Sequence, residues 1–113
     1  MSLNQMPSMA EMLIRMRKEE RLNVAIPIKI ITREKGSLAQ WSCTYEISRR
    51  GARLKQVVGV AVGQDIWVQR HTRRARFRIV WIGSPNTAES GQMGVECLDE
   101  RPLWEDEIQG RLA

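Results

Sequence analysis

The segment 73–82 alternates basic and apolar side chains with a period of two, and this pattern constrains the fold more than any other feature of the chain. Four apolar residues share one face: Ala75, Phe77, Ile79 and Trp81. Three arginines share the other: Arg74, Arg76 and Arg78. Because successive side chains of a strand point to opposite faces, the alternation predicts a half-buried strand with its arginines outside. Such a strand needs partner strands to satisfy its backbone groups.

Other segments of the chain have the same strand character and are separated by turn residues. They are 22–33, 38–47, 52–54, 65–69 and 91–98. In the first of these, Val24, Ile26, Ile28 and Ile30 share a face, and Pro27 predicts either an edge strand or a bulge because it lacks an amide hydrogen. Six short strands predict an all-β protein, and closure into a small antiparallel barrel removes the exposed edges.

The aromatic residues are expected to lie in the core of this barrel. In the segment 38–47 the alternation places Trp41, Cys43, Tyr45 and Ile47 on one face, against Gln40, Ser42, Thr44 and Glu46 on the other. Large aromatic side chains bury the most apolar area, so we assign the following residues to the core: Trp41, Trp67, Phe77 and Trp81.

Short helical segments are expected at both ends of the chain. Ser8 and Glu11 form a capping box, and apolar residues follow at helical spacing, which predicts a helix over 9–20 with a methionine-rich face. A short helical turn is expected within 102–109. The predicted organisation is an N-terminal helix and arm (1–21), a barrel (22–100) and a short acidic C-terminal segment (101–113). The N-terminal helix is also a candidate for packing between two copies of the chain.

The charge distribution favours an anionic partner for the main body of the chain. The sequence has 18 Lys and Arg against 13 Asp and Glu, a formal net charge of +5, whereas acidic residues outnumber basic ones over 96–113. Most basic residues are arginines, whose planar guanidinium matches phosphate oxygens and the edge of guanine. The sequence has no apolar stretch of the ~20 residues that span a bilayer and no secretory signal pattern, so a cytoplasmic protein is expected.

The residues that usually carry catalysis or metal binding do not form a recognisable pattern. Cys43 and Cys97 have neither metal-ligand spacing nor a CxxC motif, and both are expected to be buried free thiols. The single histidine, His71, lies among arginines and is expected on a surface loop. We therefore expect neither catalytic residues, nor a metal site, nor a cofactor, and the chain is not expected to be an enzyme.

Two short motifs lie where a predicted element ends. Arg17 and Arg21 flank Lys18-Glu19-Glu20 just before the first strand, and Glu46-Ile47-Ser48-Arg49-Arg50-Gly51 follows a strand and begins a turn. Together they resemble the RxxxR and (D/N)xSxxG motifs of the PilZ domain family, in the same order and with a barrel after them. The resemblance covers about residues 15–100. It implies a six-stranded antiparallel PilZ-like barrel, with an N-terminal helix and a short C-terminal helical turn.

The resemblance also implies that cyclic di-GMP, a dianionic second messenger, is the ligand. Arg17 and Arg21 would bind its phosphate and guanine groups, since charge-assisted arginine contacts are strong. Glu46 and Ser48 would contact the second guanine or ribose, and Gly51 would shape the turn. Arg49 and Arg50 are further candidate contacts. The chain departs from the motif at Glu46, where the family has Asp or Asn, and the longer side chain moves the carboxylate by about one bond length.

Other functions remain open at this stage. A degenerate PilZ-like adaptor that binds no nucleotide is one, and Glu46 favours it. A basic small-barrel nucleic-acid binder is another, but we expect no aromatic residue beside Arg74, Arg76 and Arg78 for bases to stack on, so nucleic acid is disfavoured. That arginine row is interpreted as an outer barrel face paired with carboxylates such as Glu96. A receptor of this size would pass its signal to a downstream protein partner, by ordering the N-terminal arm.

Overall fold

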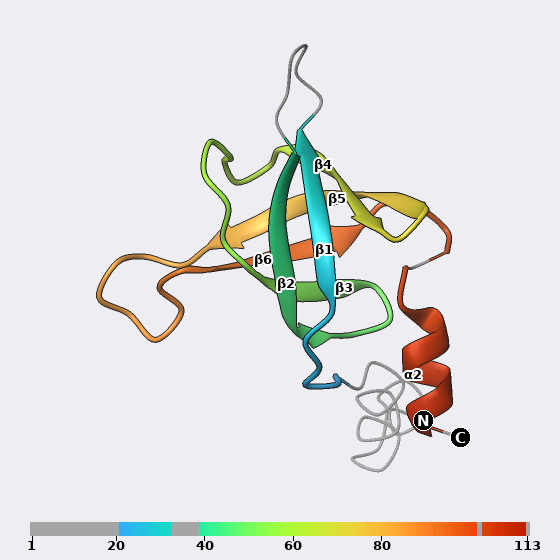
Figure 1. Cartoon of the computed structure of the whole chain (residues 1–113). Helices are drawn as coiled ribbons and strands as arrows, with labels where there is room; N and C mark the ends of the chain where they lie inside the picture. Colours follow the sequence, from blue (N-terminus) through green and yellow to red (C-terminus); the bar gives the residue numbers. More distant parts are fainter. Residues whose placement is uncertain (1–20, 33–38, 102, 113) are drawn as a thin grey trace, which may run out of the picture.

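The computed structural model describes residues 21–32, 39–101 and 103–112, which form a closed antiparallel β-barrel with a helix beside it (Figure 1). The strands are β1 (Pro27–Thr32), β2 (Ala39–Ile47), β3 (Gly51–Lys55), β4 (Asp65–Arg70), β5 (Arg73–Ile82) and β6 (Gln92–Cys97). The helix is α2 (Glu105–Leu112). The predictions of an all-β fold, a six-stranded antiparallel barrel and a short C-terminal helix are therefore confirmed.

The order of the strands around the barrel is β1-β2-β3-β6-β5-β4. The strands β1 and β4 consequently lie across the barrel from β6 and β3. Pro27 is the first residue of β1 and pairs with Cys43 without a register shift, and β1 is bonded to β2 on one side and β4 on the other. The prediction of an edge strand or bulge at Pro27 was wrong, because a proline at the first position of a strand interrupts few ladder bonds.

The barrel encloses one apolar core, to which every strand contributes. In β1, Ile28 and Ile30 are fully buried, and in β5 the predicted inward residues Ala75, Phe77 and Ile79 are buried as well. The other buried apolar residues are Ile26, Ile47, Leu54, Val57, Ile66, Val68, Met93, Val95, Cys97, Leu103, Trp104 and Ile108. The period-two pattern therefore predicted the inward faces of β1 and most of β5.

A β-bulge in β2 reverses the predicted faces of most of that strand. The register of β2 against β3 shifts between Thr44 and Glu46. Thr44 is fully buried and its hydroxyl accepts a hydrogen bond from the Ile26 amide at 2.8 Å, whereas Tyr45 is exposed and Ile47 is buried. Because the extra residue changes the phase of the alternation, Ser42 and Thr44 point inward, and Cys43 is only partly buried.

Two tryptophans lie on the outside of the barrel, Trp41 because of this change of phase in β2 and Trp67 because it alternates with the buried Ile66 and Val68 of β4. Trp41 is 71% exposed and Trp67 is partly exposed, so both core assignments were wrong. Trp67 pairs with Arg76 across β4 and β5, and the guanidinium of Arg74 lies 5.7 Å from the centroid of the Trp67 ring. The expectation that the arginine row has no aromatic neighbour was therefore also wrong.

The arginines of β5 do point outward, as predicted. Arg78 lies opposite Glu96 in the register of β5 and β6, but its ion pair is with Asp65 of β4, at 3.2 Å. His71, in the two-residue turn between β4 and β5, is exposed and adopts a φ of 54°, which confirms its expected place on a surface loop.

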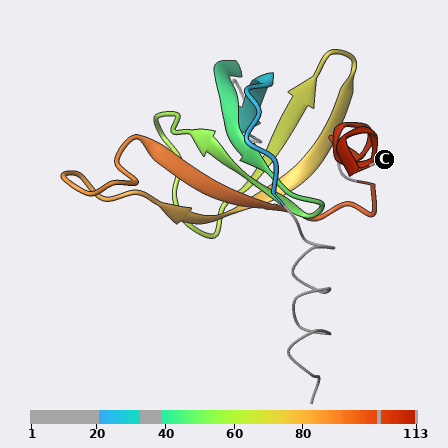
Figure 2. The same ribbon diagram turned by 90° about the horizontal axis from the view of Figure 1, so that it is seen from below.

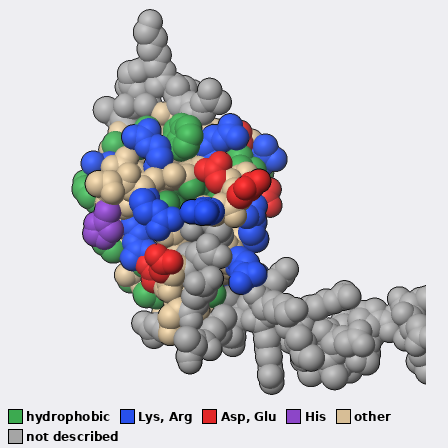
Figure 3. Space-filling model, turned by 90° about the vertical axis from the view of Figure 1, so that its right-hand side faces the viewer, with side chains coloured by type: hydrophobic (Ala, Val, Ile, Leu, Met, Phe, Trp, Pro, Cys, Tyr) green, Lys and Arg blue, Asp and Glu red, His purple; other side chains and the backbone are tan. Residues whose placement is uncertain are grey.

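In the segment after β6, Trp104 packs into the core of the barrel. The chain then forms α2 beside the β4–β5 hairpin (Figure 2). Trp104 is fully buried, and its ring lies 5.2 Å from that of Phe77 between centroids. Glu107 of α2 forms an ion pair with Arg70, and Asp106 lies 3.9 Å from Arg73. The view onto this side of the barrel shows basic side chains spread across the face, with fewer acidic ones among them (Figure 3).

The predicted N-terminal helix (9–20), Arg17 and the proposed contact between two copies through that helix lie outside the described residues. Within the part of the chain that the structure describes, α2 is too short and too polar to cross a membrane, and no other helix qualifies.

Candidate ligand-binding site

The residues of the second motif lie on the rim of the barrel, where β2 ends and β3 begins. An isolated bridge joins Leu22 to Ile47, with the amide of each residue donating to the carbonyl of the other at 2.8 and 2.9 Å. This bridge fixes the chain just before β1 against the end of β2. Arg21 is consequently placed beside Glu46, although 25 positions separate them in the sequence.

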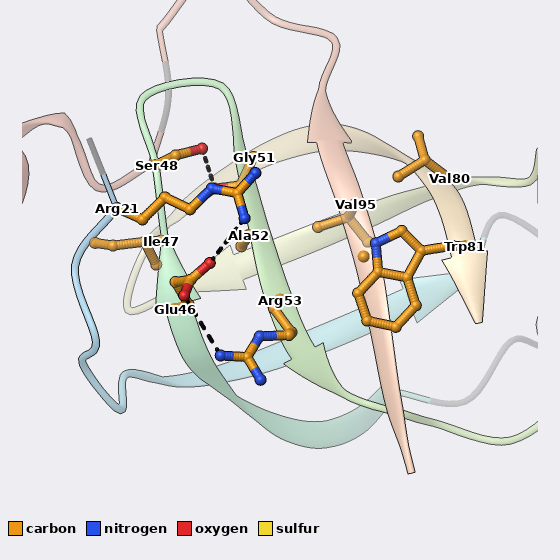
Figure 4. Close-up of a pocket in the computed structure, with 11 residues that line it drawn as sticks. Arg21, Glu46, Ile47, Ser48, Gly51, Ala52, Arg53, Val80, Trp81 and Val95 are labelled. Atoms are coloured by element: carbon orange, nitrogen blue, oxygen red, sulfur yellow. Dashed lines mark hydrogen bonds and ion pairs between the residues drawn. The ribbon is translucent and has the colours of Figure 1, made fainter. Parts of the chain in front are cut away.

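Glu46 lies between two guanidinium groups (Figure 4). Its Oε1 accepts from Arg21 at 3.2 Å, and its Oε2 accepts from Arg53 at 3.4 Å. Arg53 also donates to the side chain of Gln92 on β6 at 2.8 Å. The Arg21 side chain is 72% exposed, so its ion pair with Glu46 is worth little and readily exchanges for another anion.

Arg53 is a site residue that the sequence motifs do not identify. It lies directly opposite Glu46 in the register of β2 and β3. The signal available in the sequence is its spacing from Gly51, because residues two apart in a strand share a face. That spacing shows that Arg53 and Gly51 share a face of β3, but which neighbours this face meets depends on the register of β3.

The turn from Ser48 to Gly51 is closed by hydrogen bonds within it. The Ser48 amide donates to the Gly51 carbonyl at 2.9 Å, and the Ser48 hydroxyl lies 3.4 Å from the same oxygen. Gly51 pairs with Glu96 at the start of β3, and a Cβ placed there would lie 2.8 Å from the carbonyl oxygen of Val95. The backbones of β3 and β6 approach closely because Gly51 has no side chain.

Gly51 does not adopt the backbone conformation with positive φ for which a turn glycine is expected. Among the described residues, the glycines with positive φ are Gly59, Gly63 and Gly91, all in loops. Gly51 therefore serves the close approach of two strands and not a left-handed turn.

Arg50 is directed towards the C-terminal segment and away from the pocket. Its guanidinium donates to the carbonyl oxygens of Cys97 at 3.1 Å, Asp99 at 2.9 Å and Glu100 at 3.4 Å. Arg49 is exposed. Neither arginine lines the pocket described below, so the structure does not bring these two predicted contacts together with Arg21, Glu46, Ser48 and Gly51.

The rim turn is also held from below by Trp104. The indole Nε1 of Trp104 donates to the carbonyl oxygen of Ser48 at 2.8 Å. Nearby, burial raises the pKa of the Cys97 thiol, while a hydrogen bond to the backbone of Asp99 and the charge of Arg50 oppose the shift. The backbone of the second motif is therefore fixed to the core and to the segment that leads to α2.

An open pocket of about 180 Å³ lies beside these residues (Figure 4). Its lining residues are Arg21, Glu46, Ile47, Ser48, Gly51, Ala52, Arg53, Val80, Trp81, Gly94 and Val95. The charged residues lie along one side and Trp81 along the other, so the pocket combines hydrogen-bond donors and acceptors with a flat apolar wall.

Trp81 belongs to this wall and not to the core to which it was assigned. The register of β5 against β6 shifts between Ile79 and Trp81, so Trp81 is only partly buried. Its indole lies where a Cβ on Gly94 would be, in direct contact with that glycine. The bulge thus places the ring against Gly94 in the wall of the pocket, which the simple alternation of β5 does not predict.

The described residues contain no group of three or more His, Cys, Asp or Glu that could hold a metal ion. The arrangement is one of binding groups: guanidiniums, a carboxylate, a hydroxyl and an indole.

Comparison with solved structures shows the same closed six-stranded antiparallel barrel in a PilZ domain and in a second protein. The structure titled inhibitor of motility (MotI/DgrA) from Bacillus subtilis superimposes with a TM-score of 0.57 and 17% identity over 81% of this chain. The PilZ domain of CeSA from a cellulose-synthesizing bacterium superimposes with a TM-score of 0.55 and 17% identity over 82% of this chain and 93% of its own.

The chain thus has a PilZ-domain fold, as its motifs suggested. It spans 46% of the length of the Bacillus subtilis protein, about half. Neither protein-family models nor the sequences of curated proteins give a match.

Proposed function

We propose that this protein is a receptor module for cyclic di-GMP that binds the dinucleotide at the rim pocket. The observation that carries the proposal is the convergence of Arg21, Glu46, Ser48 and Gly51 on one rim, from two segments far apart in the sequence. These are the positions that match the two PilZ motifs. The PilZ fold supports the same function, and a binding module agrees with the kinds of side chains in the pocket.

The chemistry of the pocket suits a nucleotide with phosphates and a purine. The guanidiniums of Arg21 and Arg53 supply donors for phosphate oxygens or for the O6/N7 edge of guanine. The Trp81 indole offers a flat apolar surface against which a base packs. A volume of about 180 Å³ suits a single base, so the remainder of the dinucleotide would lie on the open rim, where Arg17 of the preceding arm is expected to contribute.

Glu46 determines how a ligand can enter the site. In the described structure its carboxylate pairs with both Arg21 and Arg53, so a ligand phosphate has to replace it. Once released, the carboxylate becomes an acceptor for the N1 and N2 hydrogens of guanine. We infer that ligand binding exchanges one set of ion pairs of Arg21 for another and orders the arm before it against the rim. A partner that recognises the ordered arm would receive the signal.

Isothermal titration calorimetry with cyclic di-GMP tests this function. We expect the parent protein to bind and Arg17→Ala and Arg21→Ala each to weaken binding by at least about tenfold, since a hydrogen bond to a charged group contributes ~1.5–3 kcal/mol. Arg74→Ala is the matched control, because Arg74 lies on the outer face of β5 and does not line the pocket. If the parent binds and both motif variants bind as tightly as it does, the site assignment is wrong.

The second candidate is an adaptor with the PilZ fold that binds no nucleotide. The specific observation in its favour is that Glu46 already pairs with both described guanidiniums of the pocket. A thermal-shift measurement separates the two functions, because only a ligand of the native state raises the unfolding midpoint. A folded protein whose midpoint is unchanged by cyclic di-GMP would support the adaptor.

A further inference from the structure

A second surface of the barrel, on the side away from the rim pocket, combines exposed aromatic rings with cations. It is centred on β1 and β4, which lie across the barrel from β6 and β3, and extends onto β2 and β5. One row of outward side chains crosses four adjacent strands in register: Trp41, Lys29, Gln69 and Arg74. We call this row, together with Trp67, the outer aromatic face.

The cations of the outer aromatic face lie over aromatic rings. The ammonium of Lys29 is 4.9 Å from the centroid of the Trp41 ring, and Arg74 lies over Trp67 in the same way. Among the described residues, neither cation has a carboxylate within 4.0 Å, whereas Arg21, Arg53, Arg70 and Arg78 all do. The outer aromatic face therefore carries positive charge that the described part of the chain does not neutralise.

A hollow of about 230 Å³ lies beside the most exposed ring. It is lined by Pro27, Lys29, Trp41, Gln69 and His71, none of which belongs to the rim pocket. Trp41 is 71% exposed, which is a large apolar area to leave in water. Tryptophan and arginine are the residues that most often dominate binding energy at protein interfaces, usually around one well-packed anchor.

We propose that the outer aromatic face is a docking surface for an acidic segment of a partner protein, with one apolar or aromatic side chain of the partner seated in the hollow against Trp41. The uncompensated charge of Lys29 and Arg74 selects acidic residues flanking that anchor. The hollow has room for one large side chain, which fits a single anchor. The proposal rests on this face alone and does not depend on nucleotide binding.

The geometry favours a peptide over a single-stranded nucleic acid. Nucleic-acid platforms stack successive bases on a series of aromatic rings. Here a cation already lies over one face of each ring, and only Trp41, which is 71% exposed, keeps a large open surface for an incoming group. One ring beside a hollow suits one anchor side chain better than a run of stacked bases.

A peptide-display selection tests the proposal, with a random peptide library and the whole chain as bait in the absence of nucleotide. We expect the parent protein to enrich peptides in which Asp or Glu flank a Leu, Phe or Trp. Fluorescence polarisation with an enriched, labelled peptide is expected to show binding that is weakened by about tenfold or more in Trp41→Ala, as for an interface hot spot. Lys29→Ala is expected to weaken binding and to reduce its dependence on salt.

Matched variants make the test specific. Tyr45→Ala removes an exposed aromatic residue at the bulge of the same strand, and Lys55→Ala removes an exposed lysine of β3. Both are expected to bind the peptide as the parent does, and unchanged thermal midpoints would show that every variant is folded. The proposal is overturned if no acidic bias is selected, if Trp41→Ala binds equally well, or if oligo-dT or oligo-U binds this face in place of the peptide.

Discussion

The rim pocket and the outer aromatic face both contain arginine or lysine together with tryptophan, but the cations have different partners in the two regions. In the rim pocket one carboxylate, Glu46, pairs with both Arg21 and Arg53. On the outer aromatic face the cations lie over indole rings without a carboxylate partner among the described residues. The first arrangement requires an incoming anion to displace an internal one, whereas the second leaves its charge available.

The two regions also differ in how they are attached to the core. The rim turn is hydrogen-bonded to Trp104 beneath it and to the C-terminal segment through Arg50. Trp41, in contrast, projects into solvent. Substitutions of Trp104 or Arg50, which fix the rim turn, should therefore disturb the fold, while substitutions on the outer aromatic face should change only what the protein binds.

The largest difference in the free energy of unfolding is expected between alanine substitutions of two tryptophans, Trp104 and Trp41. Trp104→Ala removes a fully buried ring, its contact with Phe77 and the hydrogen bond to Ser48, so we expect a loss of about 3–5 kcal/mol in the free energy of unfolding. Trp41→Ala should change this free energy by no more than about 0.5 kcal/mol, because the ring is exposed. Urea denaturation of both variants makes the comparison, and equal losses would contradict it.

A smaller loss of stability is expected at Gly51. A methyl group there meets the Val95 carbonyl oxygen at 2.8 Å, and backbone atoms of β6 have to move, so Gly51→Ala should cost about 1–3 kcal/mol of unfolding free energy. Gly110 in α2 is the matched control, because a Cβ there meets nothing within 4 Å. Gly110→Ala should be neutral or stabilising by ~0.5–1 kcal/mol. Denaturation curves in which both variants are equally stable would argue against the close approach of β3 and β6.

The smallest effect is expected from the buried thiol near the rim. Since burial raises the pKa of Cys97 above its ordinary value of 9.0, the thiol ionises at lower pH in the unfolded chain than in the native one. Its contribution to stability is therefore present below pH 9.0 and is lost as the pH rises through the native pKa. The unfolding free energy of the parent should decline more steeply above this pH than that of Cys97→Ala. Parallel curves for the two proteins would contradict the inferred shift.

Much of the fold could be predicted because the alternation of apolar residues directly reports which side of a strand is buried. It succeeded for β1 and for Phe77 and Ile79 of β5. It failed beyond the bulges, since an inserted residue changes the phase and no local signal marked either position. Trp41 and Trp81 were assigned to the core for this reason.

The site was predictable to the extent that it is encoded in short motifs. Glu46, Ser48 and Gly51 were found together, and Arg21 lies with them as expected. Arg53 and Trp81 were missed because their membership depends on strand register, which brings β3, β5 and β6 together only in the closed barrel. Arg50 was assigned to the ligand because it lies within the motif, but its guanidinium binds the carbonyls after β6.

The most direct test of the account uses the indole N–H signals of the 4 tryptophans in a proton–nitrogen correlation spectrum. Trp81 lines the rim pocket, Trp104 lies beneath the rim turn, and Trp41 and Trp67 belong to the outer aromatic face. On addition of cyclic di-GMP we expect the Trp81 signal to shift most, the Trp104 signal to shift less, and the signals of the other two to stay in place. Shifts confined to Trp41 and Trp67, or a spectrum unchanged at saturating dinucleotide, would contradict a nucleotide site on the rim.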